Sequence, residues 1–398
     1  MSQNPRSVQG AIPFRSWADN LESDCLKQMR NACSLPVTVA AALMPDAHVG
    51  YGVPIGGVVA CENAVIPYAV GVDIACRVKL TILDIPPKDL NNTGAVRFFI
   101  DTIERETRFG IGAEFKTPRQ HEVLDRDWTI SPVTHAHKRK AEGQLGTSGS
   151  GNHFVELGTV ELPNADLGLE AGTYVALLSH SGSRGSGAAV CNHYSRLASQ
   201  LHPELPRELQ HLAWLDLDSE AGQEYWAAMS LMGEYASANH AVIHREMVRA
   251  LKCTALGSIE NHHNFAWKET HSGRDLIVHR KGATPAGAGV LGFIPGSMAT
   301  PGFIVRGKGN AQALDSAAHG AGRRMSRTAA KKNLNWEDAR RFLKERRVTL
   351  ISASLDEVPS VSKNIDDVMA AQRDLVEVVG RFDPRIVKMA PDGEKAED

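Results

Sequence analysis

The sequence predicts an α+β fold, in which helices and β-strands form one compact domain of mixed α and β structure. Short apolar or alternating segments such as 77–83 (RVKLTIL) and 173–180 (TYVALLSH) are typical of strands. Segments with helical spacing of apolar residues, of which 219–250 is the longest, predict helices. No repeat, low-complexity tract or convincing linker divides the 398 residues, so one compact unit is the preferred interpretation.

The expected elements mix helices and strands along the whole chain. Helices are expected at 17–33, where Asp19 lies near the start, 94–109, 187–200, 219–250, 322–332, 336–346 and 364–379. Strands are expected at 37–44, 58–61, 65–70, 77–83, 173–180, 275–280, 290–294 and 302–306. The glycine- and proline-rich segment 45–57 and the polar segment 110–148 are expected to be irregular. We expect residues 1–390 to form the domain and residues 391–398 to form a flexible tail.

Composition excludes several classes of protein. The net charge of −2 argues against a polycation of the histone type, although a local basic groove is still allowed. Six scattered cysteines form no regular framework and indicate cytosolic free thiols. No run approaches the roughly 18 apolar residues that a membrane span needs, and residues 1–17 show no apolar signal-peptide segment. These observations predict a cytoplasmic protein without a membrane partner.

The segment GVDIAC places Asp73 and Cys76 three residues apart, directly after an apolar run. Alone, this pair favours a structural interpretation, because aspartate often caps helices and cysteine is often buried in cores. Glycine-flanked histidines change that balance: His153 in GSGNHFVE, His180 in LSHSGSRG and His263 in NHHN. A mixed set of N, O and S ligands suits Mn²⁺, Zn²⁺ or Co²⁺. Five ligands with a bridging thiolate predict two ions, an arrangement used in phosphoryl transfer.

Glycine-rich loops add candidate phosphate contacts. Loops 146–152 (GTSGSGN) and 181–185 (SGSRG) can present backbone N–H groups to anionic oxygens, and Arg184 can add a forked contact. Arg280 and Lys281 in HRKGAT lie beside a glycine and are further candidates, as is Ser297 in the turn of IPGSM. Each loop taken alone is equally typical of an ordinary turn.

His319 in AHGAGR is followed by a flexible sequence that permits close approach of a ligand. It is a candidate metal ligand, general base or nucleophile at phosphorus, and the residues alone do not choose among these roles. Downstream, residues 323–347 contain ten Arg or Lys and three acidic residues. This segment is either a solvated helix face or the wall of a groove for an RNA backbone.

The order of these motifs resembles the RtcB family of RNA ligases. The similarity runs from about residue 37 to about residue 388 and includes PDAHVGYG, GVDIAC, GSGNHFVE, HSGSRG, HHN, HRKGAT, IPGSM and HGAGR. It implies central β-sheets flanked by helices around a central cleft for metal and nucleotide. It also implies a GTP- and Mn²⁺-dependent ligase that joins RNA with a 2′,3′-cyclic phosphate or 3′-phosphate to RNA with a 5′-hydroxyl.

The resemblance also assigns roles to residues. Cys76 would bridge two Mn²⁺ ions, one completed by His180 and His263 and the other by Asp73 and His153. His319 would accept GMP from GTP as a covalent intermediate, from which RNA-3′-pp-G forms. The residues implied to hold the nucleotide are Asn152, Glu156, Ser297, Ala321, Gly322 and Lys388. Asp46 and His48 would line the RNA end or the metal region, and Arg184, Arg280 and Lys281 are the further candidates for substrate contact.

Three positions depart from the family pattern, namely Arg77 after the cysteine, Gly302 and Ser362. The resemblance implies tRNA splicing or RNA repair, and an archease-like activator is a candidate partner of an expected monomer. One alternative is a binuclear phosphoesterase that opens cyclic phosphates without ligation. Another is an RNA-binding module without catalysis, in which Cys76 would be dispensable.

Overall fold

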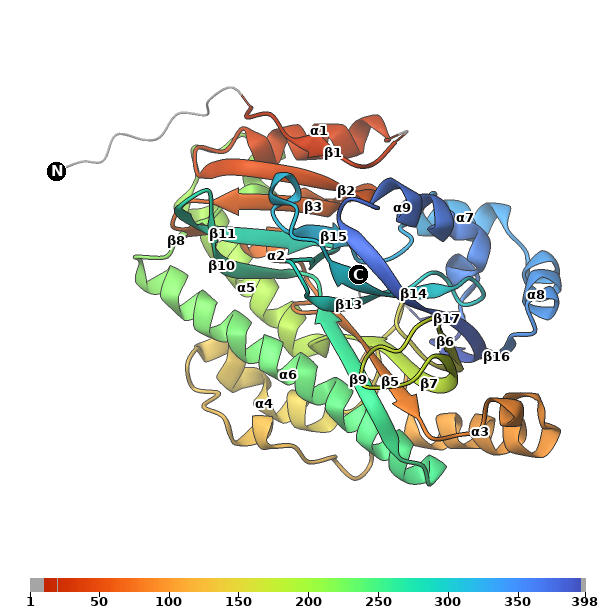
Figure 1. Ribbon diagram of the computed structural model, residues 1–398. Coiled ribbons are helices and arrows are strands. Elements are labelled where there is room, and N and C mark those ends of the chain that lie inside the picture. Colours follow the sequence, from red (N-terminus) through yellow and green to blue (C-terminus); the bar gives the residue numbers. More distant parts are fainter. Residues whose placement is uncertain (1–10, 20, 395–398) are drawn as a thin grey trace.

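The largest β-sheet lies at the centre of the fold in the computed structural model, which describes residues 11–19 and 21–394 (Figure 1). Its eight strands have the order β13-β14-β17-β6-β7-β5-β9, with β16 added on β17. The bounds are β5 (Arg77–Leu83), β6 (Phe154–Leu162), β7 (Gly172–Ser181), β9 (Ala255–His262), β13 (Leu291–Ile294), β14 (Gly302–Gly307), β16 (Thr349–Ser352) and β17 (Val376–Met389). Neighbours are antiparallel except β16 and β17.

This sheet curls until its two ends nearly meet. The side chain of Asn261 in β9 closes the gap to β13: its Nδ2 donates to Phe293 O at 3.2 Å, and Phe293 N donates to its Oδ1 at 2.7 Å. An amide side chain thus replaces the backbone pairing that a fully closed barrel would have. Apolar side chains fill the inside of the curl, including Val78, Leu178 and Phe382.

A second sheet of five strands has the order β1-β2-β3-β11-β10. Its strands are β1 (Arg15–Ser16), β2 (Thr38–Tyr51), β3 (Val53–Cys61), β10 (Phe265–His271) and β11 (Arg274–Lys281). Two small sheets pair β4 (Ala64–Val65) with β8 (Leu215–Asp216) and β12 (Ala283–Pro285) with β15 (Ser316–Ala318). The second sheet contributes residues to the site from β2, and the small sheet of β12 and β15 contributes the segment that follows β15.

Helices surround these sheets (Figure 1). They are α1 (Ser23–Cys33), α2 (Pro67–Val70), α3 (Thr93–Glu106), α4 (Pro132–Gln144), α5 (Arg184–Leu201), α6 (Glu220–Leu251), α7 (Arg327–Asn333), α8 (Trp336–Glu345) and α9 (Ile365–Ala371). Short 3₁₀ helices occur at Pro87–Asn91, Glu122–Asp125, Arg207–Leu212, Ala311–Ala313, Leu355–Glu357 and Pro359–Val361. The predicted mixed α and β architecture is confirmed, with several sheets and flanking helices.

The strongest sequence patterns predicted their elements correctly. Segment 77–83 is β5, 173–180 lies within β7, 219–250 lies within the single helix α6, and 336–346 largely matches α8. The predicted helix at 17–33 begins only at Ser23. Helix α7 likewise begins five residues after the start predicted at residue 322.

Other expectations were wrong. Segment 45–57 lies mostly in β2 and β3, because two register shifts, between Leu43 and His48 and between His48 and Tyr51, absorb its irregular sequence. Gly56, with φ of +83°, lies so close to Ala47 that a Cβ there would be 2.9 Å from the Ala47 Cα. The glycine content of segment 45–57 therefore reflects close contact between the two strands rather than a loop. Segment 65–70 is mostly α2, since Pro67 starts a helical turn.

The segments 110–148 and 364–379 also differ from expectation. Within the first, Pro132 starts α4, whose N-terminus is capped by Ser131 accepting from Thr134 N. In the second, the helix ends at Ala371 and β17 begins at Val376. Strands β6, β9, β10, β12, β15 and β16 were not predicted. Of the predicted tail, residues 395–398 lie outside the described part of the chain, whereas Asp392 accepts from Trp336 Nε1 at 3.0 Å.

Among residues 11–19 and 21–394, no helix is both long enough and apolar enough to cross a bilayer.

Acid should destabilise this fold through buried histidines such as His279 in β11. Its Nδ1–H donates to Val59 O at 3.1 Å and its Nε2 accepts from Ile66 N at 2.9 Å, so only the neutral ring fits. Burial lowers the pKa of His279 to about 4. The unfolded chain takes up this proton below about pH 6.5 and the folded chain only near pH 4, so stability falls as the pH falls through that window.

The expected loss is about 3 kcal/mol in the free energy of unfolding from this residue, which urea titrations at a series of pH values would measure. His279→Gln is the matched control and should lose less stability over the same pH range. An equal loss in both proteins would contradict this assignment.

Candidate functional site

The five candidate metal ligands come from four segments that the central sheet brings together. Asp73 and Cys76 lie between α2 and β5, His153 directly precedes β6, His180 lies in β7, and His263 directly follows β9. Strand β5 lies between β7 and β9 in the sheet. The register, in which position 77 pairs with both 181 and 262, therefore aligns the ends of these strands at one edge.

The ligand atoms of these residues converge. Cys76 Sγ lies 3.1 Å from His180 Nε2 and 3.4 Å from His153 Nε2. His153 Nε2 lies 3.1 Å from Asp73 Oδ2, and His180 Nε2 lies 3.3 Å from His263 Nε2. The ligand atoms of Cys76, His153 and His180 all lie within 4.8 Å of one another. A buried group of one thiol and two imidazoles, with a third imidazole and a carboxylate in contact, is suited to bind borderline divalent metals.

Backbone groups orient these ligands. His180 Nδ1 donates to Asn152 O at 3.0 Å, which leaves the lone pair of Nε2 directed at the cluster. Ser183 N donates to Asp73 Oδ1 at 3.1 Å, and His263 N donates to Cys76 O at 2.9 Å. Burial lowers the pKa of both His180 and His263 well below the usual value, so both rings stay neutral, the form that binds a metal.

His319 follows β15 and lies beside this cluster, its ring centroid 4.7 Å from that of His263. Its Nδ1 lies 2.7 Å from Asp46 Oδ2, and its backbone N donates to the same oxygen at 3.3 Å. Because a carboxylate accepts, the proton is on Nδ1 and the lone pair is on Nε2. Asp46 is 0% exposed, so it contacts His319 rather than lying open along an RNA path.

Close contact with Asp46 explains why the second glycine of HGAGR, Gly322, is a glycine. This residue has φ of +73°, and a Cβ there would lie 2.1 Å from the backbone oxygen of Asp46. Glycine is therefore required for the segment after His319 to pack against Asp46.

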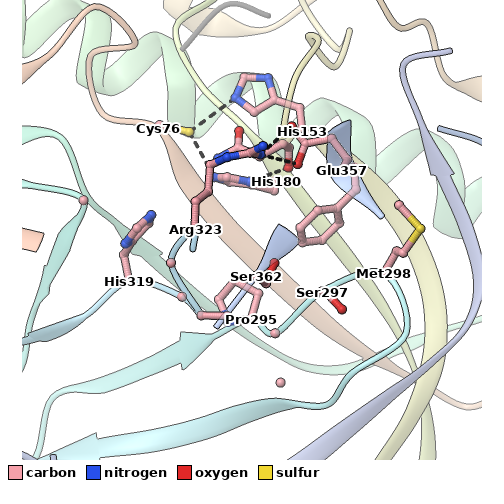
Figure 2. Close-up of a pocket in the computed structure, with 18 of the residues that line it drawn as sticks. Cys76, His153, His180, Pro295, Ser297, Met298, His319, Arg323, Glu357 and Ser362 are labelled. Carbon is pink, nitrogen blue, oxygen red and sulfur yellow. Dashed lines mark hydrogen bonds and ion pairs between the residues drawn. The ribbon is translucent and has the colours of Figure 1, made fainter. Parts of the chain in front are cut away.

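A cavity opens beside the metal ligands and His319 (Figure 2). It is lined by all five candidate metal ligands, by His319, and by the candidate nucleotide contacts Asn152, Glu156, Ser297, Ala321 and Gly322. Figure 2 shows Cys76, His153 and His180 on one side of the cavity and Ser297 and Met298 on another. Burial raises the pKa of the Glu156 carboxyl well above its usual value.

Lys388 is not among the residues that line this cavity, and its nucleotide contact stays a prediction. Val387 and Met389 line the cavity, and alternation along β17 directs Lys388 to the opposite face. There its Nζ lies 5.6 Å from the Phe109 ring centroid.

Of the candidate RNA contacts, His48 lines the cavity and Arg280 does not. Arg280 is bonded to other groups of the protein. Arg280 is 1% exposed and its guanidinium forms a bidentate pair with Glu269, at 2.7 and 3.0 Å. It also donates to Ser316 Oγ and Leu314 O. These contacts make Arg280 a structural residue that joins β11 to the segment around β15.

Lys281 and Arg184 are likewise buried among protein groups. Lys281 donates to the backbone oxygens of Tyr51 and Tyr68, and burial lowers the pKa of its ammonium to about 8. Arg184 Nη2 donates to Gly110 O at 3.0 Å and its Nε to Thr147 Oγ1 at 3.1 Å. Both cations hold loops in place, and neither is among the residues that line the cavity.

Sequence reasoning missed several lining residues, of which Arg323 and Glu357 are charged. Arg323 donates to Asp356 O at 2.9 Å and lies 3.4 Å from the Glu357 carboxylate. Its place as the last residue of HGAGR, four positions after His319, was an available signal. In the basic segment 323–347, Arg327 and Lys331 also pair with Asp356, so part of that charge is neutralised within the protein.

The departures at Gly302 and Ser362 both line the cavity. A Cβ at Gly302 would lie 2.4 Å from the Phe293 ring, so glycine here permits the ring to pack at the wall.

Comparison with known proteins gives a consistent result over most of the chain. The family model described as tRNA-splicing ligase RtcB matches residues 28–130 and 125–389. RNA-splicing ligase RtcB of Escherichia coli strain K12 is 34% identical over 400 residues, which cover 92% of this chain and 95% of that protein. tRNA-splicing ligase RtcB of Nanoarchaeum equitans is 32% identical, with 96% of each chain covered. RNA-splicing ligase RtcB of Mycobacterium tuberculosis is 32% identical, with 90% and 98% covered.

Proposed function

Because this chain belongs to the RtcB family of RNA-splicing ligases, an enzyme family, we propose that it joins RNA ends in a GTP- and Mn²⁺-dependent reaction. One end would have a 2′,3′-cyclic phosphate or 3′-phosphate, and the other a 5′-hydroxyl. The observation that supports this best is the shared cavity, which His319, held by Asp46, lines together with the buried thiol and imidazole ligands.

The donor set fits two divalent ions. Cys76 Sγ contacts Nε2 of both His153 and His180, which supports a bridging thiolate. His180 and His263 would complete one site, and Asp73 and His153 the other. When bound, such ions neutralise charge on the reacting phosphate and on the leaving pyrophosphate.

His319 would act as the nucleophile. Its Nε2 lone pair attacks the α-phosphorus of GTP, an N–P bond forms, and the bond from that phosphorus to the bridging oxygen of pyrophosphate breaks. Asp46 accepts the Nδ1–H hydrogen bond throughout and stabilises the positive charge that develops on the ring. A 2′,3′-cyclic phosphate would first be opened by water, which breaks the bond from phosphorus to O2′ and leaves a 3′-phosphate. The GMP group then passes from His319 to an oxygen of the RNA 3′-phosphate, giving RNA-3′-pp-G and free His319. The 5′-hydroxyl attacks this activated phosphate and GMP leaves.

The wall of the cavity would hold the nucleotide. Glu156 is buried and lines the cavity, and we propose that it accepts hydrogen bonds from the N–H groups of guanine. Asn152, Ser297, Ala321 and Gly322 lie along the same wall and would contact the ribose and phosphates. His48 remains the proposed contact for the RNA end.

A ligation assay tests this proposal. Two RNA strands, one ending in a 2′,3′-cyclic phosphate and one starting with a 5′-hydroxyl, are incubated with protein, Mn²⁺ and GTP. The expected result is a joined strand whose formation stops when GTP is omitted. Opening of the cyclic phosphate without joining, with or without GTP, would favour the binuclear phosphoesterase. RNA retention without any turnover would favour the binding module.

We also propose a domain organisation, a location, an oligomeric state, a process and a partner for this protein. The ligase domain would span residues 1–390, with residues 391–398 as its tail. The protein would be a cytoplasmic monomer, would act in tRNA splicing or RNA repair, and would have an archease-like activator as its candidate partner.

A further inference from the structure

Helix α6 presents a polar face to the central sheet where an apolar one would be expected. Gly233, Ser237, His240 and His244, here called the α6 polar stripe, are spaced by four, three and four residues and so share one face of the helix. The side chains of this stripe bond to polar groups on β5, β7 and β9. Both histidines are at most 4% exposed. Burial of a polar group costs free energy unless the group is hydrogen-bonded, so each buried polar atom of the stripe needs a partner.

The two histidines form a directed chain of hydrogen bonds. His240 Nε2 donates to Ser181 O at 3.0 Å, so its Nδ1 accepts from the Ser179 hydroxyl at 2.6 Å. Ser179 Oγ in turn accepts from His244 Nε2 at 2.8 Å, and His244 Nδ1 accepts from the Thr81 hydroxyl at 2.7 Å. Every ring nitrogen has one partner of the correct kind, which requires that both rings be neutral. Burial keeps them neutral, lowering the pKa of His240 to about 4 and that of His244 well below its usual value.

Arg77 connects the part of the α6 polar stripe formed by Gly233 and Ser237 to the loop that contains Asp73 and Cys76. Its Nη1 pairs with Glu260 Oε1 at 2.5 Å, its Nη2 donates to Gly233 O at 2.9 Å, and its Nε donates to Ala75 O at 3.2 Å. Ser237 Oγ donates to the same Glu260 oxygen at 2.8 Å. One guanidinium therefore ties α6, β9 and the residue before Cys76 to one another.

These contacts lie directly behind the metal ligands. Ser179 and Ser181 flank His180 in β7, and alternation along the strand directs His180 to the cavity while its neighbours face α6. Arg77 follows Cys76 in the same way. Hydrogen bonds are directional, so they fix the position of a strand along a helix more sharply than apolar packing does.

We propose that Arg77, Ser179 and the α6 polar stripe are positioning residues of the metal centre, which set the places of Cys76 and His180. The inference rests on the proposed metal site and extends it to residues that touch neither metal nor substrate. It also gives Arg77, one of the three residues that depart from the family pattern, a specific function.

Titration of the full-length protein with Co²⁺ alone tests this inference, because thiolate-to-cobalt charge-transfer absorption reports directly on Cys76. Ser179→Ala removes two hydrogen bonds of the chain with little change in volume, and Arg77→Met removes the tie to Glu260. Each variant should bind Co²⁺ about 10- to 100-fold more weakly and with an altered absorption band. Arg77→Lys should recover part of the affinity.

Tyr235→Phe is the matched control. It removes another buried hydrogen bond of α6, from Tyr235 to Ala141 O at 2.8 Å, on the side facing α4. It should lower the melting temperature and leave the Co²⁺ affinity and spectrum unchanged. Wild-type affinity and spectrum in both Ser179→Ala and Arg77→Met, with only a lower melting temperature, would overturn the inference. If Arg77→Met does not fold, Ser179→Ala decides alone.

The wild-type titration separates this inference from the proposed function. Absence of the thiolate band in wild-type protein would overturn the metal centre, and the positioning function with it. A normal wild-type band together with unaltered variants would overturn the positioning function alone.

Discussion

Replacement of His319 by alanine is expected to abolish transfer of labelled GMP from GTP to the protein. The Nε2 lone pair is the only group on this side chain that can form the N–P bond, because Nδ1 carries the proton that is donated to Asp46. Loss of a covalent nucleophile typically costs more than about 10³-fold in rate. Incubation with α-labelled GTP and Mn²⁺, followed by denaturing electrophoresis, measures the adduct.

Asp46→Asn tests the hydrogen bond between Asp46 and His319 Nδ1 while the imidazole is retained. An amide at this position can donate to Nδ1, which would place the ring proton on Nε2 and remove the attacking lone pair. By analogy with a carboxylate that orients a histidine in other enzymes, labelling should slow by about 10²- to 10⁴-fold. Metal binding should be retained in both variants, because neither residue is among the five ligands. Undiminished labelling of His319→Ala would place the nucleophile on another residue.

Much of the site could be predicted because its motifs lie at the ends of strands. The Asp73–Cys76 pair alone favoured a structural role, and the register of β5 between β7 and β9 is what places it against His180 and His263. Sequence gives the donor types but not this register. The residues behind the site could not be predicted at all, since α6 meets β5 and β7 only through long-range packing.

Charge was the least reliable guide. Arg280 and Lys281 have the composition of a phosphate site, yet Arg280 pairs with Glu269 across the β10–β11 hairpin and Lys281 is buried among backbone oxygens. A sequence shows which side chains are charged but not which are already neutralised by a neighbour. Register is hidden from the sequence in the same way: a shift in β17 between Pro384 and Ile386 decides which residues of that strand face the cavity, and no pattern in RIVKM reveals it.

Replacement of Cys76 by alanine should have the second large effect, loss of metal binding. The thiol contacts both His153 and His180, so its removal takes a shared ligand from both proposed sites rather than one ligand from one site. We expect that fewer than two ions remain after dialysis and that labelling by GTP falls with them. Metal analysis of dialysed protein measures the stoichiometry. Cys76→Ser should not restore it, because a neutral hydroxyl replaces a thiolate.

Cys191→Ala is the matched control, because its chemistry is the same and its surroundings are not. Cys191 is buried in α5, where burial raises the pKa of its thiol to about 11, and its sulfur contacts Pro67 O and Ser195 Oγ rather than imidazoles. A protonated thiol among such groups does not bind a metal. Full metal content in Cys191→Ala and depleted content in Cys76→Ala would support the bridging thiolate. Two retained ions in Cys76→Ala would show that the histidines and Asp73 suffice, and would leave Cys76 with only the structural role that a lone D-x-x-C first suggests.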